Sequence, residues 1–152
     1  MKRNNVFVSL CLSILTFLMS PSCNDPYCDE LIAKLEINTC KENQNDCLID
    51  MKNVFGHNWQ YIYIFHGFNT PEDISNALGF EYSGGAIYDH TRLILLIRDN
   101  KVKESFKTEC PLINLDRLLK NGYMRLDSSN SELALSISSY NGKRQYILGF
   151  NK

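Results

Sequence analysis

The stretch Trp59-Gln60-Tyr61-Ile62-Tyr63-Ile64-Phe65 decides the fold of this chain. Every residue in it except Gln60 is aromatic or β-branched, which is typical of a β-strand. Side chains alternate between the two faces of a strand. One face would therefore carry Ile62 and Ile64, and the other would carry the aromatic residues Trp59, Tyr61, Tyr63 and Phe65. Because both faces are apolar, the pattern predicts a central strand covered on both sides.

A short helix is predicted a few residues further on, over residues 71–78. Thr70 is a good N-terminal cap, Pro71 suits the first helical position, and acidic residues follow in the first turn. Gly79 is a typical helix stop. Residues 80–90, which contain Ser83-Gly84-Gly85, are predicted to be a loop.

The rest of the chain is rich in predicted strands. Asp99-Asn100 and Asn141-Gly142 are turn signals, and the second is a strong hairpin signal. Further strands are expected at 47–54, 93–97, 102–108, 123–126, 133–137 and 145–150, and short helices at 30–35 and 112–119. The order lacks strict strand–helix alternation. It predicts an α+β fold with an antiparallel sheet of about five to seven strands and one or two short packed helices.

The N-terminus has the pattern of an export signal. Lys2 and Arg3 are followed by the uncharged, mostly apolar stretch 6–19 and then by Ser20-Pro21-Ser22. A helix over 6–19 would be roughly 21 Å long, and the hydrocarbon core of a bilayer is about 30 Å thick. We therefore expect residues 1–22 to be a signal peptide and not a membrane-spanning anchor.

Cysteine counting suggests a lipid anchor at Cys23. The chain has six cysteines; Cys11 would leave with the signal, and five would remain. A cysteine at the new N-terminus after a signal resembles the lipid-modified cysteine of bacterial lipoproteins. That resemblance implies acylation (palmitate) at Cys23 and a location in the cell envelope, on the periplasmic or extracellular face of a membrane. Ser20 and Pro21 depart from the usual cleavage motif. The alternative is ordinary cleavage after Ser22, which leaves a soluble protein with one spare thiol.

Four cysteines then remain for two disulfides, which an oxidising compartment favours. They are Cys28, Cys40, Cys47 and Cys110. A Cys40–Cys47 bridge is one of the pairings that the sequence allows. No C-x-x-C pair is present, so no metal site is predicted. We expect residues 23–29 to be the attachment cysteine and a tether, and residues 30–152 to be a single domain.

Charge narrows the choice of partners. The chain has 16 basic and 17 acidic residues; removing Lys2 and Arg3 leaves 14 basic against 17 acidic, a net charge of −3. Without a basic excess, nucleic acid is not an expected partner. A polybasic membrane-binding patch is not expected either. No cofactor is predicted, and the expected partners are a membrane, through the lipid, and another protein.

No catalytic signature stands out. Asp89-His90 near Ser83 has the residue types of a triad, but a solvated loop histidine is the simpler interpretation. No Gly-x-Ser-x-Gly elbow occurs, and Ser83-Gly84-Gly85 is too short for a phosphate loop. A cysteine nucleophile is not expected where cysteines are paired or lipidated. We therefore predict a protein that is not an enzyme.

The stretch from Trp59 to Lys101 is similar to a loose family of small uncharacterised bacterial envelope lipoproteins. The residues that carry the similarity are Trp59, Tyr63-Ile64-Phe65, Leu78-Gly79-Phe80 and Asp99-Asn100-Lys101. Gln60 and Tyr61 stand where that family has acidic and basic residues. The resemblance implies a fold and an envelope location, and it implies no activity.

Binding to another protein is the predicted activity. The aromatic face of 59–65 is expected to pack under the helix at 71–78, and an exposed platform is the alternative. Tyr82, Tyr88 and His90, around the glycine loop, are the candidate binding residues, because loops carry function and tyrosine binds at low entropy cost. The leading hypothesis is a non-catalytic protein-binding module. The alternatives are an immunity or inhibitor protein against a secreted toxin, an envelope-assembly accessory and, last, a small hydrolase.

Overall fold

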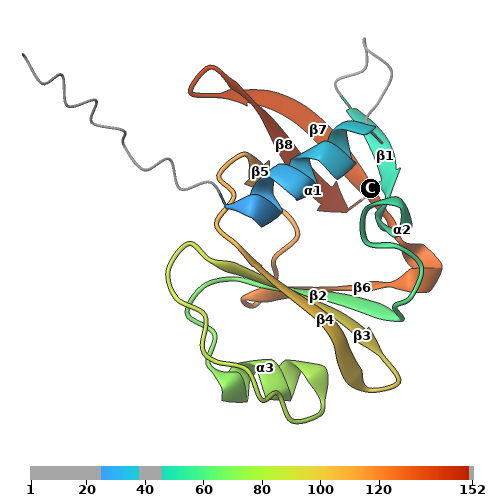
Figure 1. Ribbon diagram of the computed structural model, residues 1–152, viewed down its shortest axis with the longest axis vertical. Coiled ribbons are helices and arrows are strands. Elements are labelled where there is room, and N and C mark those ends of the chain that lie inside the picture. The colour runs from blue at the N-terminus through green and yellow to red at the C-terminus, as the bar shows by residue number, and fades with distance from the viewer. Residues whose placement is uncertain (1–24, 38–45, 151–152) are drawn as a thin grey trace, which may run out of the picture.

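Strand β2 (Tyr61–Phe65) lies inside a sheet, as its two apolar faces predict. The computed structural model describes residues 25–37 and 46–150 (Figure 1). One sheet has the strand order β4-β3-β2-β6 and the other β1-β7-β8-β5, four strands each. All pairs are antiparallel except β5 with β8. The α+β class is confirmed, and its strands are divided between two sheets.

The remaining elements follow in chain order. They are α1 (Pro26–Ile37), β1 (Asp46–Asp50), α2 (Met51–Phe55), α3 (Pro71–Leu78), β3 (Arg92–Arg98), β4 (Lys101–Thr108), β5 (Ile113–Asn114), β6 (Tyr123–Asp127), a 3-10 turn (Ser128–Asn130), β7 (Glu132–Tyr140) and β8 (Lys143–Phe150). None of the helices in the described part of the chain is long and apolar enough to cross a membrane.

The main core lies between the two sheets. Ile62 and Ile64 of β2 face this core, together with inward residues of β1, β3, β6, β7 and β8. Helix α1 closes one side of the space between the sheets, where Leu35 is fully buried. Trp59 also packs here, and its indole N–H donates to the carbonyl oxygen of Gly56 at 2.7 Å. The prediction that Trp59 shares a face with Tyr61, Tyr63 and Phe65 is wrong, because Trp59 precedes the strand and turns to the opposite side.

A second core lies on the other face of β2. Tyr63 and Phe65 are buried there with Ile74 of α3 and with residues of β3. This confirms that the aromatic face of β2 packs under α3. The helix has the predicted bounds: the Thr70 hydroxyl accepts from the N–H of Asp73, the Asp73 carboxylate accepts from the N–H of Thr70, and Gly79 ends the helix at φ 77°.

Three expected segments differ in the structure. Helix α1 begins at Pro26 and not at Glu30, so residues 26–29 belong to the folded domain. The expected strand at 47–54 divides at Asp50, whose carboxylate accepts from the N–H of Lys52 and caps α2. The helix predicted at 112–119 is wrong: residues 113–114 pair with β8 instead, because the N–H of Tyr146 binds the carbonyl of Leu112 and draws the segment into the sheet.

The start of α1 is fastened to the end of β4. Cys28 and Cys110 form a disulfide across a sequence separation of 82 residues. Just before this disulfide in the chain, the Asp25 carboxylate accepts a hydrogen bond from the Thr108 hydroxyl at 2.6 Å and another from the N–H of Glu109 at 3.0 Å. The first described residue, Asp25, is therefore attached directly to the end of β4.

The disulfide prediction is partly tested. Cys28–Cys110 is formed, and Cys47 is also disulfide-bonded. Because Cys28 and Cys110 bind each other, the partner of Cys47 is not among the described residues. Cys23 and Cys40, for which the sequence predicts lipid attachment and a bridge to Cys47, lie outside the described residues as well.

Removing the Cys28–Cys110 bridge is expected to destabilise the domain strongly. A cross-link that closes a loop of this length lowers the entropy of the unfolded chain, which corresponds to about 4 kcal/mol. Urea denaturation of the Cys28→Ser/Cys110→Ser double variant should show a free energy of unfolding lower by about that amount. A change below about 1 kcal/mol would contradict a stabilising role of this bridge.

Acid should destabilise the domain partly through Asp25. Burial opposes ionisation of its carboxyl group, but hydrogen bonds from Thr108 and from the backbone outweigh burial and hold the pKa below its usual value. A lowered folded-state pKa contributes stability that is present above about pH 4 and is lost as the pH falls through the folded pKa. In urea titrations from pH 6 down to pH 2, Asp25→Asn should flatten this loss; an unchanged slope would contradict it.

Candidate functional site

Two of the most exposed large apolar side chains of the described residues lie on neighbouring loops. Phe68, between β2 and α3, has a relative solvent-accessible surface of 73%, and Tyr88, between α3 and β3, has one of 72%. We call these two residues, with loop segments 66–69 and 87–91, the aromatic tip. Exposed apolar side chains that lie together are more informative than single ones, because a contiguous apolar patch marks an interaction site.

The two loops of the tip are joined through their backbones. The N–H of Phe68 donates to the carbonyl of Ile87 at 2.8 Å, and the N–H of Ile87 donates to the carbonyl of Asn69 at 3.0 Å. A side chain at Gly67 would lie 1.7 Å from the carbonyl oxygen of Asp89, so only glycine allows this approach. The tip is therefore one rigid unit made from two separate loops.

Asn69 fastens this unit to the sheet. Its amide group donates to the carbonyl of His66 at 2.7 Å and to the carbonyl of Gly122 at 3.3 Å. The N–H of His66 also donates to Gly122, at 2.9 Å, which extends the pairing of β2 with β6. The position of the two loops is therefore set by the end of the central strand β2.

Phe68 has an unusual backbone conformation, because the other described non-glycine residues with a positive φ are all Asp or Asn, which tolerate that region. Phe68 has φ 71° and Asp89 has φ 49°, both in the left-handed region that favours glycine. A non-glycine residue in this region costs about 1–2 kcal/mol. Ile87 is buried, and its backbone bonds to Phe68 and Asn69 help to fix the conformation of the two loops. The exposed ring of Phe68 adds no packing that would offset its strain, which is the pattern expected of residues kept for recognition.

Polar groups surround the tip on the side of β3. Asp89 and His90 form an exposed pair, with 3.3 Å between Oδ1 and Nε2. The Thr91 hydroxyl donates to the Glu109 carboxylate at 2.9 Å, and Arg92 pairs with Asp116 at 3.1 Å. The arrangement is an apolar centre with a charged border, as in protein interfaces.

Of the binding residues predicted from the sequence, the structure brings together Tyr88 and His90 and separates Tyr82 from them. Tyr82 is half-buried with its ring over Gly84, and burial raises the pKa of its phenol group. It lines a hollow with Ser83 and with the turn between β3 and β4, at the opposite end of β3 from Thr91. Ser83 is therefore not placed to act with His90.

Sequence reasoning missed Phe68. Gly67-Phe68-Asn69 follows an apolar strand directly, so its phenylalanine looks like one more core residue. Its exposure results from the left-handed backbone and from the contact of Gly67 with Asp89. The only usable signal was a Gly-aromatic-Asn turn beside a helix cap.

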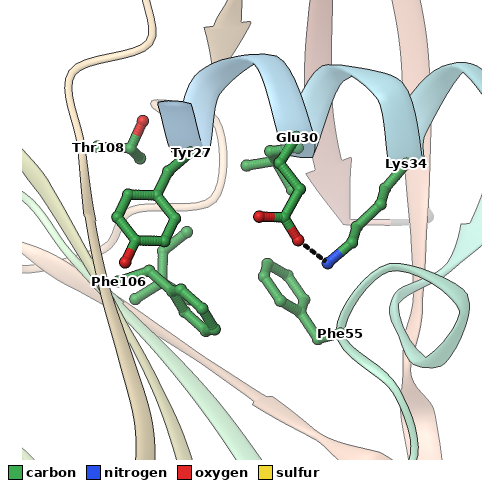
Figure 2. Close-up of a pocket in the computed structure, with 8 residues that line it drawn as sticks. Tyr27, Glu30, Lys34, Phe55, Phe106 and Thr108 are labelled. Carbon is green, nitrogen blue, oxygen red and sulfur yellow. Dashed lines mark ion pairs between the residues drawn. The ribbon is translucent and has the colours of Figure 1, made fainter. Parts of the chain in front are cut away.

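One pocket of the domain is too small for a small-molecule ligand. A pocket between α1, α2 and β4 is lined by Tyr27, Leu31, Phe55 and Phe106, and the ion pair of Glu30 with Lys34 lies at its rim (Figure 2). Its volume of about 30 Å³ is that of a single water molecule, far below the several hundred Å³ of a small-molecule site. Residues 25–37 and 46–150 contain no cluster of three or more His, Cys, Asp or Glu side chains suited to a metal ion.

A wider hollow of about 770 Å³ lies between the start of α1, the end of β4 and the β7–β8 turn, and Thr91 is its one lining residue from the tip loops. Asp25 and Thr91 both line it, and Lys107, Tyr140 and Lys143 are among its other lining residues. Comparison with known proteins gives no match, neither to a family model nor to a curated protein nor to a solved structure.

Replacing Phe68 by glycine should stabilise the isolated protein. The change removes the left-handed strain and an exposed ring that packs against little, so the free energy of unfolding should rise by about 1 kcal/mol. Gly67→Ala should act in the opposite direction, because its methyl group would overlap the Asp89 carbonyl. Chemical denaturation of both variants checks this; a destabilised Phe68→Gly variant would show that Phe68 serves the fold.

Proposed function

We propose that this chain is an exported protein, anchored to a membrane of the cell envelope by a lipid on Cys23, and that it binds another protein through the aromatic tip. The observation that carries the proposal is the exposure of Phe68 and Tyr88 on strained, hydrogen-bonded loops. Catalysis plays no part in the proposed activity.

Export is supported by the N-terminal pattern and by the disulfides. Residues 1–22 have the charge and apolar order of a signal peptide. Cys28 and Cys110 are bonded to each other, and Cys47 is bonded too, which suits an oxidising compartment. Anchoring rests on the position of Cys23 directly after that signal.

Protein binding is supported by the chemistry of the tip. Burying a fully exposed phenylalanine or tyrosine contributes about 2 kcal/mol, and aromatic residues are enriched among the few that dominate binding energy. The loops are fastened by Asn69 and Gly67, so little conformational entropy is lost on binding. Exposed aromatic side chains suit a pocket of a partner protein better than they suit a small molecule.

Inhibition of a secreted toxin and assistance in envelope assembly are both forms of this proposed activity. Both would use a rigid aromatic contact with a charged border. The identity of the partner decides between them, and both stay predictions.

Capture of the partner from native envelopes tests the proposal. The acylated full chain is crosslinked in its host, and the yield of the stoichiometric partner is compared between variants. Phe68→Gly and Tyr88→Ala should each lower the yield at least about tenfold, since each removes a buried aromatic contact worth more than 1.4 kcal/mol. Equal yields from wild type and both tip variants would refute recognition by the tip.

A matched control is Phe150→Ala. Phe150 is also exposed, at 43%, and lies at the far end of β8 from the β7–β8 turn, remote from the start of α1. It should leave the yield unchanged. Intact mass of the captured chain should also show loss of residues 1–22 and addition of acyl chains; an unmodified Cys23 would refute the anchor.

A further inference from the structure

The fold begins very close to the proposed anchor. Asp25 is already held by Thr108 and Glu109, and Cys28 is bonded to Cys110. Cys23 precedes Asp25 by two residues. Two residues span at most about 7 Å even when fully extended. A lipid on Cys23 would therefore hold the Asp25 end of the domain at the bilayer surface.

The aromatic tip lies at this same end of the domain. A series of short contacts connects the two: the N–H of Glu109 donates to Asp25 at 3.0 Å, the Thr91 hydroxyl donates to Glu109 at 2.9 Å, and the N–H of Thr91 donates to the carbonyl of Tyr88 at 3.2 Å. Phe68 joins through the carbonyl of Ile87. All of these hydrogen bonds lie within the folded domain, so the fold sets the distance from Asp25 to the tip.

The surface between these points is open. The hollow of about 770 Å³ that Asp25 and Thr91 share is bordered by Lys107 and Lys143, and by Tyr140 at the β7–β8 turn. In Figure 1 the start of α1, the β7–β8 turn and the loop that precedes β3 all lie on the left of the molecule. This end therefore carries an exposed aromatic side chain together with both basic and acidic side chains.

We propose that the partner is an integral membrane protein of the same membrane, and that the aromatic tip contacts it at the level of the bilayer surface. The inference rests on the proposed function, since it requires both the lipid on Cys23 and recognition by the tip. The short connection limits the distance between the tip and the bilayer surface, which raises the effective concentration of the tip for a membrane-level surface and excludes a distant one.

A series of spacers tests this inference. One, two, four and six Glu-Ala-Ala-Ala-Lys units are inserted between Asn24 and Asp25 of the acylated full chain. Such segments are mostly helical and extend by about 1.5 Å per residue, so four units lift the domain by up to about 30 Å. The same units added after Lys152 serve as the control, because they change length and charge without changing the height of the tip.

Crosslinking yield in intact membranes should fall at least about fivefold by four units and should stay constant in the C-terminal control series. Capture of the detergent-solubilised partner should be equal for all chains, because detergent removes the constraint on height. A yield in membranes that does not depend on spacer length overturns the inference, as does a captured partner without a membrane-spanning segment.

Contact of the tip with lipid alone is the competing outcome. The unacylated Cys23→Ser chain should not bind vesicles made from native envelope lipids; binding that Phe68→Gly abolishes would overturn the inference. Failure of the proposed function has a different signature, since the tip variants would then capture the partner as well as wild type at every spacer length.

Discussion

Burial of both faces of β2 is the constraint on which the rest of this structure depends. Ile62 and Ile64 face the core between the two sheets, and Tyr63 and Phe65 face α3. A strand with two apolar faces is stable only when each face is covered. The second sheet with α1 covers one face, and α3 with the loop after it covers the other. The aromatic tip lies where β2 ends, because the chain must leave the sheet there to cross to α3.

The attachment of α1 to the end of β4 is the second constraint on this domain. Helix α1 contributes few fully buried side chains, chiefly Cys28 and Leu35. A helix with so little core contact needs other attachment, which the disulfide to Cys110 and the Asp25 contacts with β4 provide. The same attachment brings the first residues of the domain beside Thr91 and the tip. The disulfide and the Asp25 contacts therefore stabilise α1 and also determine where the proposed anchor lies relative to the domain.

The tip shows a conflict between local preference and structure. Phe68 occupies a left-handed conformation that glycine would adopt more easily, and its ring is mostly exposed. The proposed contact with a partner would explain why a site that costs stability in the free protein is kept and held by hydrogen bonds. Tyr82, with similar chemistry, packs over Gly84 instead and contributes to the second core. Residue type alone does not separate these two roles.

The sequence by itself determined the α+β class, the central strand β2, the capped helix α3 and the β3–β4 and β7–β8 hairpins. Each of these depends on neighbouring residues: alternation, a capping box or an Asn-Gly turn. Only the tertiary structure decided the division into two sheets, the Cys28–Cys110 pairing, the strand at 113–114 and the exposure of Phe68. These depend on contacts between distant segments, such as Tyr146 with Leu112 and Gly67 with Asp89. Local pattern carries no information about which distant backbone a segment will meet.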